Sequence, residues 1–301
     1  MGKLIAFGWY GGKYSHLDWL LPLLPPTQHY CEPFGGSAAI LINREPAAVE
    51  TYNDLDGEVV NFFRVLREQK DALIEQIGLT PFSREEFERA CAEPTDTLSP
   101  VERARRFYVR ARQVRTGLAQ TASVGRWAHC VLTSRAGMAG AVSRWLGAVE
   151  DLSLIAQRLL RVQIEHAPAI EVFQRYDSPD RLTYCDPPYP HDSRGDSKAY
   201  AYEMTDEQHR ELADALRHAR GKVAVSSYRC ALNDELYHGW RTIEGPQKLV
   251  HSAKELRQEV LYVNYDPEDT QWRPQTKSKT TRKSKSQQPS LPEFFSEPLF
   301  N

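Results

Sequence analysis

The sequence predicts an α/β fold with a mostly parallel β-sheet. Short apolar runs typical of strands alternate with segments of helical periodicity over residues 1–80 and again over residues 148–267. An arginine-rich stretch at residues 81–147 interrupts this alternation, and a polar stretch of low complexity covers residues 268–301. We therefore expect one α/β domain built from the first two regions, an insert between them, and a disordered tail.

The expected elements of the first region follow the chain in order. A strand ends at Tyr30-Cys31, and the next helix begins within Ala38–Asn43. Ala47–Tyr52 forms a second strand, and Gly57–Arg67 forms a helix whose apolar side chains lie on one face.

The second region repeats the pattern. A helix spans residues 205–220, and Gly221 is its stop signal. The strand-like runs are Val162–Glu165, Leu182–Cys185, Val223–Ser226 and Glu259–Asn264. Strands separated by helices are typical of parallel pairing.

Composition indicates a soluble globular protein. The chain has 301 residues, 41% of them hydrophobic, and a net charge of −2, so overall charge does not mark a nucleic-acid-binding protein. Its five cysteines are scattered without a Cys-x-x-Cys pair, which argues against a disulfide framework or a zinc site. No apolar run resembles a signal peptide or membrane span. We expect a cytoplasmic protein without metal or membrane association.

The most informative motif is Asp186-Pro187-Pro188-Tyr189, which follows an apolar strand. Ligands of open α/β sheets bind at the carboxyl ends of strands, where Asp186 is expected. The prolines keep the backbone extended, so the Pro187 carbonyl is a fixed acceptor. Together, that carboxylate and that carbonyl can accept both N–H groups of an aromatic amine such as adenine N6.

Such acceptors solve a chemical problem. The lone pair of an aromatic amine is delocalised into the ring, and two acceptors restore it for attack on a methyl sulfonium. Tyr189 is then expected to stack on the base, which must be flipped out of a duplex. Catalysis rests on positioning and electrostatics without a covalent intermediate. For these four residues alone, a strand with an ordinary Asp-Pro turn is the alternative.

Two N-terminal segments combine glycines with aromatic or charged residues: Trp9-Tyr10-Gly11-Gly12-Lys13, and the strand-turn-helix segment at residues 30–38. Glycine lets a backbone approach a ligand closely. Asp54, at the end of the second strand, suits ribose hydroxyls. Taken singly, Trp9 is equally a core residue, Lys13 a solvated charge and Asp54 a helix N-cap.

The order of these motifs resembles the Dam-type, or D12-class, adenine-specific DNA methyltransferases, most closely phage-like members, over roughly residues 5–265. The matching parts are Trp9 to Lys13, Glu32 to Ala38, the insert, and Asp186 to Tyr189. The resemblance implies a Rossmann-like S-adenosylmethionine-dependent methyltransferase fold, with residues 81–147 as a helical target-recognition insert.

The resemblance also implies the site. Asp186, Pro187, Pro188 and Tyr189 hold the target adenine. The cofactor S-adenosyl-L-methionine contacts Trp9, Tyr10, Lys13, Glu32, Phe34, Gly36, Asp54, Glu165 and Asp186. Two departures are visible: Ala38 replaces the last glycine of its motif, and Glu165-His166 replaces Asp-Phe. Glu165 is the candidate for the contact to the cofactor's adenine, and His166 is interpreted as structural.

Two less specific features flank the catalytic motif. Tyr200 and Tyr202 either cover the flipped base or pack on the helix that follows them. The segment Ser226-Ser227-Tyr228 ends a strand and is a candidate pocket wall.

The insert is locally basic, because Glu102 is the only acid between Val101 and Trp145. We expect double-stranded DNA to bind here, with a loop at 116–140 reading bases in a groove. The candidate DNA-binding residues are Arg103, Arg106, Arg110, Arg112, Arg115, Arg126 and Arg135. A solvated arginine face is the alternative.

The tail carries a basic linker and then the spacing of a peptide that binds a sliding clamp. Its candidate clamp-binding residues are Gln288, Leu291, Phe294 and Phe295. The alternatives are docking of the tail on its own domain and a chance match.

The sequence thus predicts a nucleoid-associated, site-specific DNA adenine-N6 methyltransferase, and it leaves open whether the enzyme belongs to a restriction-modification pair or acts as an orphan. Three alternatives stay open. The acceptor is cytosine N4 or RNA, or the chain is a catalytically silent DNA-binding module, or it is a nucleotide-binding dehydrogenase, which leaves the Asp-Pro-Pro-Tyr motif unexplained.

Overall fold

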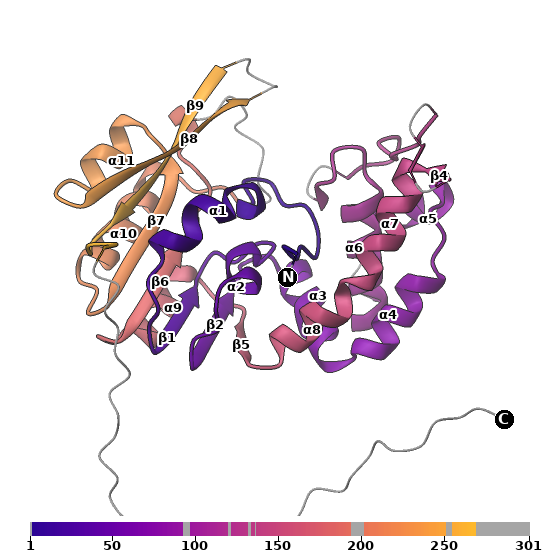
Figure 1. Cartoon of the computed structure of the whole chain (residues 1–301), viewed down its shortest axis with the longest axis horizontal. Helices are drawn as coiled ribbons and strands as arrows, with labels where there is room; N and C mark the ends of the chain where they lie inside the picture. The colour runs from indigo at the N-terminus through magenta and orange to yellow at the C-terminus, as the bar shows by residue number, and fades with distance from the viewer. Residues whose placement is uncertain are drawn as a thin grey trace, which may run out of the picture.

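The computed structural model describes residues 2–92, 97–119, 122–131, 134–135, 137–193, 202–250 and 255–268. Within this part of the chain, seven strands form one sheet in the order β5-β2-β1-β6-β7-β9-β8 (Figure 1). The strands are β1 (His29–Glu32), β2 (Val49–Asn53), β5 (Val162–Glu165), β6 (Arg181–Cys185), β7 (Lys222–Tyr228), β8 (Arg241–Val250) and β9 (Glu255–Val263).

The sheet has a switch point between β1 and β6. The strands from β5 to β7 pair in parallel, and the chain moves outward from β1 to β2 on one side and later to β6 and β7 on the other. β9 runs antiparallel between β7 and β8. Strand order reverses at β1 and β6, so their carboxyl ends form the expected ligand crevice of a doubly wound sheet. The predicted α/β fold is confirmed.

Successive side chains along each strand point to opposite faces of the sheet. On β7, Val223 and Val225 pack with α9 (Ala169–Tyr176), α10 (Asp206–Arg217) and α11 (Ala231–Leu236). Ala224 belongs to the larger core on the other face. That core includes residues of α1 (Leu17–Leu20), α2 (Ala39–Asn43), α3 (Gly57–Glu68) and α8 (Leu152–Leu159).

Helices α3 to α8 form a second lobe beside the sheet (Figure 1). Phe62 of α3 stacks on Tyr108 of α6 with ring centroids 5.6 Å apart, so the insert shares its core with the sheet domain. Ser99 begins α6, because its side chain accepts a hydrogen bond from the Glu102 N–H and Pro100 stands in the first turn. The remaining elements of the lobe are α4 (Lys70–Leu79), α5 (Arg84–Ala92), α6 (Pro100–Gln113), α7 (Gly140–Glu150), β3 (Ser134–Arg135) and β4 (Met138–Ala139).

One helix boundary differs from the prediction. Thr205 begins α10 with a capping box that includes Gln208, but the helix ends at Arg217 and not at Gly221. A side chain at Gly221 would place its Cβ 2.5 Å from the Ser178 carbonyl oxygen. This glycine therefore allows a close backbone approach before β7 and does not stop the helix.

Candidate active site

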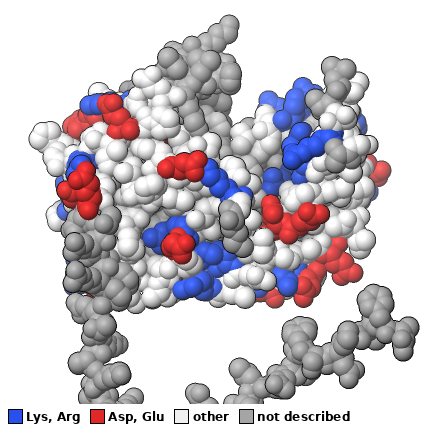
Figure 2. Space-filling model, viewed as in Figure 1, with Lys and Arg blue, Asp and Glu red and all other residues white. Residues whose placement is uncertain are grey.

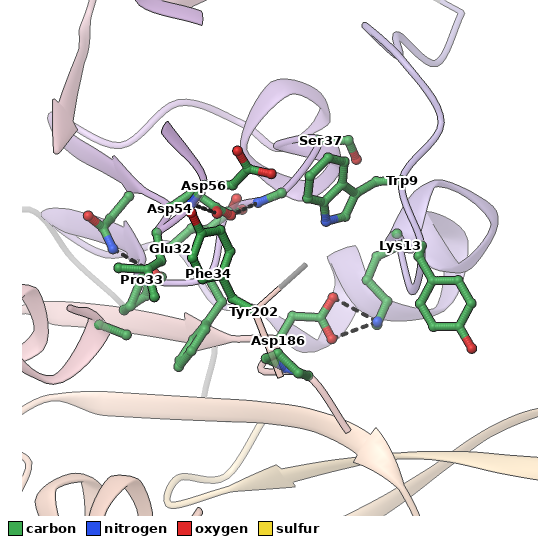
Figure 3. Close-up of a pocket in the computed structure, with 18 of the residues that line it drawn as sticks. Trp9, Lys13, Glu32, Pro33, Phe34, Ser37, Asp54, Asp56, Asp186 and Tyr202 are labelled. Atoms are coloured by element: carbon green, nitrogen blue, oxygen red, sulfur yellow. Dashed lines mark hydrogen bonds and ion pairs between the residues drawn. The ribbon is translucent and has the colours of Figure 1, made fainter. Parts of the chain in front are cut away.

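A cavity opens at the carboxyl ends of β1, β2 and β6, at the switch point of the sheet (Figure 3). The N-terminal segment and the turn after β1 form one wall, and the residues after β6 form another. Its lining includes Trp9, Tyr10, Lys13, Glu32, Phe34, Gly36, Asp54, Asp186, Pro188 and Tyr202. The structure thus brings together residues that are more than 150 positions apart in the sequence.

The turn after β1 depends on its two glycines. A Cβ at Gly35 would lie 2.1 Å from the ring of Tyr52, and a Cβ at Gly36, whose φ is +48°, would lie 2.6 Å from Trp9. Tyr52 donates a hydrogen bond to the Gly36 carbonyl at 2.8 Å. Trp9 therefore lies against this turn and lines the cavity, and it is more than a core residue.

Asp54 is fixed at the end of β2. Its carboxylate accepts hydrogen bonds from the backbone N–H groups of Gly36 at 2.7 Å and Asp56 at 2.8 Å. Burial raises its pKa to about 6 despite these hydrogen bonds. Asp56, which accepts from the Glu58 N–H, is the N-cap of α3. The N-cap of α3 is therefore Asp56 and not Asp54.

Glu32 is a second buried carboxyl in the cavity wall. It ends β1, it is 2% exposed, and it accepts a hydrogen bond from Tyr30 Oη at 2.7 Å. Burial raises its pKa to about 8, against the lowering effects of Tyr30 and Arg44. A cationic ligand group would restore its ionised form.

Asp186 directly follows β6, and its carboxylate contacts Lys13 (Figure 3) and also Ser226. Lys13 Nζ lies 2.6 Å from Oδ1 and 2.7 Å from Oδ2, and Ser226 Oγ donates to Oδ1 at 2.8 Å. Lys13 is 3% exposed, so it is no solvated surface charge. Burial lowers its pKa, but Asp186 and Glu259 outweigh that effect and the pKa of Lys13 is raised.

Tyr189 and Pro187 are buried and lie behind the cavity lining. The ring of Tyr189 is 4% exposed and packs edge-on against Tyr228, with centroids 4.8 Å apart. Its hydroxyl donates a hydrogen bond to Glu259. Stacking of Tyr189 on a base stays a prediction that requires this ring to become accessible.

Glu165 lies outside the cavity lining. Its carboxylate accepts hydrogen bonds from Tyr176 Oη at 2.6 Å and Arg175 at 3.1 Å, both on α9. Leu55 and Ala169 line the cavity wall nearby. The structure therefore does not bring Glu165 to the cavity, where it was predicted to contact the adenine of the cofactor.

Three site residues were not singled out from the sequence. Glu259 on β9 lies 3.6 Å from Lys13. Asn53 donates to the carbonyls of Pro33 and Ala167, and so joins the loops after β1 and β5. Gln208 lines the cavity beside Tyr202. Ser226, expected as a pocket wall, instead contacts Asp186 directly.

The arginines of the insert fall into two groups. On α6, Arg103 and Arg110 both pair with Glu58 of α3, at 2.6 and 2.9 Å, and Arg106 pairs with Glu102 at 2.7 Å. Arg112 donates to the Ile5 carbonyl at 2.8 Å. The exposed arginines of the insert are Arg84, Arg89, Arg115, Arg126, Arg135 and Arg144. Figure 2 shows Lys and Arg atoms gathered at the upper right, where α7 and β4 lie.

Other predictions meet different limits. Tyr200 and the clamp-binding candidates at residues 288–295 lie outside the described residues. In the described part, no group of three or more His, Cys, Asp or Glu side chains is placed to hold a metal ion. No described helix is long and apolar enough to cross a membrane. The cytoplasmic, nucleoid-associated location stays a prediction.

The geometry was compared with known proteins. A search of curated proteins found no match. Among solved structures, the fold is similar to a conserved hypothetical protein of Streptococcus pyogenes (TM-score 0.34, 8% identity, covering 84% of this chain and 96% of that chain). A SAM-dependent methyltransferase of Agrobacterium tumefaciens is similar as well (0.35, 9%, 85% and 62%), as is the putative methyltransferase yhhF of Escherichia coli (0.32, 11%, 83% and 84%). Such low TM-scores support no conclusion about function.

A family model gives a stronger result. The model of the D12 class N6 adenine-specific DNA methyltransferases matches residues 9–251. The match begins at Trp9 and contains the glycine turn, the insert and the Asp186 motif, which are the parts that form the cavity and the helical lobe. The chain therefore belongs to the D12 class of N6 adenine-specific DNA methyltransferases, which are S-adenosylmethionine-dependent enzymes.

Proposed function

We propose that this chain methylates the N6 amine of an adenine flipped out of double-stranded DNA, and that Asp186 engages this amine. The observation that carries the proposal is the position of Asp186. Its carboxylate ends β6 at the switch point, faces the cavity, and is oriented by Lys13 and Ser226. A carboxylate fixed in this way is pre-organised to accept a hydrogen bond from an amine.

The cavity residues fit S-adenosyl-L-methionine. Asp54 stands where a ribose diol binds in doubly wound folds. Glu32 and Lys13 offer opposite charges to the ammonium and carboxylate of an amino acid, and Phe34 and Leu55 offer apolar surface to a base. When bound there, this cofactor supplies an electrophilic methyl group.

The chain's own residues then prepare the nucleophile. Asp186 and, once it becomes accessible from the cavity, the Pro187 carbonyl accept the two N–H groups of adenine N6, which localises the nitrogen lone pair. The nitrogen forms a bond to the methyl carbon as the sulfur–carbon bond breaks. One N–H proton then leaves to Asp186 or to water, which restores a neutral amine. Tyr202, which is 50% exposed and lines the cavity, is positioned to cover the base.

DNA is proposed to bind the exposed arginines of the helical lobe. Arg115 and Arg135 are exposed at the end of this lobe, whereas Arg103 and Arg110 are paired with Glu58. Exposed guanidinium groups can neutralise phosphates without breaking an internal ion pair. The proposed phosphate-binding surface therefore includes fewer arginines than the set predicted from the sequence.

Transfer of labelled methyl to unmethylated duplex DNA tests the function. Nucleoside analysis follows the label, and Asp186→Ala is assayed beside the wild-type chain, with Asp214→Asn on α10 as a control. We expect label in N6-methyldeoxyadenosine that is lost only in Asp186→Ala. Label in cytosine, or in RNA supplied as a competitor, would overturn the acceptor. Intact cofactor and DNA binding without any label would indicate a silent module.

A further inference from the structure

The ammonium group of Lys13 lies between two carboxylates, one that faces the cavity and one that is buried. Its Nζ is 2.6 Å from Asp186 and 3.6 Å from Glu259, and it also donates to the Gly11 carbonyl at 2.6 Å. The side chains of Lys13 and Glu259 are 3% and 4% exposed. The ammonium therefore donates hydrogen bonds to Gly11 and Asp186 and forms a longer ion pair with Glu259, and the nearer carboxylate is the one that faces the cavity.

This arrangement conflicts with the proposed role of Asp186. Lys13 contacts both oxygens of Asp186, and Ser226 donates to one of them. A target amine has to approach the same carboxylate, so it competes with Lys13 for its lone pairs. A buried ammonium cannot give up its carboxylate partner without another one, because an unpaired buried charge is strongly unfavourable.

Glu259 is placed to be that other partner. It lies in the middle of β9, opposite Tyr228, the last residue of β7, so this part of β9 reaches the same sheet edge as the end of β7. The hydroxyl of Tyr189 donates to Glu259 and anchors it. The titratable or charged groups that face Glu259 are Lys13 from the N-terminal segment, Asp186 and Tyr189 after β6, and Tyr228 on β7.

We propose that Glu259 is a positioning residue for methyl transfer, which takes over the Lys13 ammonium when the target amine binds Asp186. A short shift of the ammonium lengthens its contact with Asp186 and shortens its contact with Glu259. The Asp186 carboxylate is then free to accept the amine, while Lys13 keeps a buried anionic partner. This inference rests on the proposed function. Glu259 lies beyond residues 9–251, the range that the family model matches.

The first test is Glu259→Gln, which removes the charge and keeps the shape. Lys13 then has Asp186 as its remaining carboxylate partner and stays on it. We expect kcat for methyl transfer to DNA to fall about 10- to 100-fold, with the KM for S-adenosylmethionine nearly unchanged. Glu259→Asp keeps the charge and should restore a large part of the rate. Glu244→Gln on β8, whose carboxylate pairs with Arg229 at 3.0 Å, is the matched control.

A pH profile separates positioning from a purely structural role. Burial raises the pKa of Glu259, although Lys13 counteracts this effect. Protonated Glu259 cannot receive the ammonium, so the wild-type rate should fall on the acid side. Glu259→Gln has no carboxyl group to protonate at this position, so this acid limb should be lost in the variant.

A double variant tests whether Glu259 acts through Lys13. If it does, Glu259→Gln should have little further effect on the rate in a Lys13→Met background. Should Glu259→Gln unfold, which a thermal melt would show, Glu259→Asp and the double variant carry the test. A folded Glu259→Gln with the wild-type rate and pH profile would overturn the inference, as would additive effects in the double variant. Failure of the wild-type chain to methylate adenine would instead overturn the proposed function.

Discussion

Two clusters of charged residues in this molecule contain ion pairs of equal length in different surroundings. Lys13 and Asp186 approach to 2.6 Å at the cavity, with exposed fractions of 3% and 17%. Arg103 and Glu58 also approach to 2.6 Å, between α6 and α3, with exposed fractions of 28% and 22%. A short ion pair alone therefore does not distinguish a reactive site from a structural contact.

The surroundings make the distinction. The cavity cluster brings two carboxylates, Asp186 and Glu259, to one ammonium, and one of them faces open space. The helical cluster brings two guanidinium groups, Arg103 and Arg110, to one carboxylate, and this joins two helices of the lobe. Excess acceptors beside a cavity are available to a ligand, whereas the acceptors between the helices are already used.

The largest expected effect distinguishes the clusters directly. Asp186→Asn should lower kcat about 100- to 1000-fold, because the neutral amide is a weaker acceptor than the carboxylate and cannot stabilise the positive charge that develops on the attacking nitrogen. Glu58→Gln should leave kcat within a few-fold and lower the free energy of unfolding by about 1 kcal/mol, since the pairs are partly exposed. Methyl-transfer kinetics and urea unfolding of both variants check this. Equal losses of kcat would remove the distinction between the clusters.

The next effect sharpens the account of the cavity. Burial raises the pKa of Asp54 to about 6, and its ionised form is the acceptor for a ribose diol. The Asp54 contribution to the affinity for S-adenosylmethionine should therefore be present above this pKa, and the affinity should show an inflection there and fall up to about tenfold per pH unit below it. Calorimetric titration against pH measures this. Asp54→Asn should bind weakly and lose this inflection; an inflection that persists in this variant would assign it to another group.

A smaller effect concerns the arginines themselves. Arg115→Ala and Arg135→Ala should each reduce the salt dependence of DNA binding by about one unit of log–log slope, because each removes one phosphate contact. Arg112→Ala, which removes the contact to the Ile5 carbonyl, should lower stability and leave that slope unchanged. Binding titrations at several salt concentrations check the prediction. An unchanged slope in all three variants would place the DNA elsewhere.

The two clusters also explain what the sequence could predict. The cavity was predicted from motifs in a fixed order. The motifs at Glu32 and Asp186 end or follow neighbouring strands of one sheet, and the N-terminal segment with Lys13 packs against them, so the fold brings them together. The arginines were predicted from the charge within one window of sequence. Their partner Glu58 lies 45 residues before Arg103, outside that window. Counting charges along the chain therefore cannot show which of them are already paired.

Strand direction accounts for the remaining difference. The run at Glu259 was expected to be a strand and belongs to β9, but a periodicity of two does not reveal which way a strand runs. The parallel strands reach the ligand crevice with their carboxyl ends, whereas β9 runs the other way and reaches this edge at Glu259, in the middle of the strand. The partners of Glu165 could not be predicted from the sequence either, because Tyr176 and Arg175 face it only once α9 packs beside β5.

The smallest expected effect concerns backbone strain in the turn beside the cavity. Ala38 has φ +54° and precedes α2, at the position where the family motif has glycine. A left-handed conformation costs a residue with a Cβ about 1–2 kcal/mol. Ala38→Gly relieves this strain but loses conformational entropy on folding, so it should change the free energy of unfolding by less than about 1 kcal/mol.

Ala39→Gly is the matched control for this position, because Ala39 is the first residue of α2 and lacks a positive φ. It should destabilise the protein by about 0.5–1 kcal/mol. Urea unfolding of both variants gives the comparison. Equal destabilisation by the two substitutions would mean that the backbone at Ala38 is not strained. A smaller loss of unfolding free energy for Ala38→Gly than for Ala39→Gly would show that the backbone at Ala38, beside the cavity, is strained.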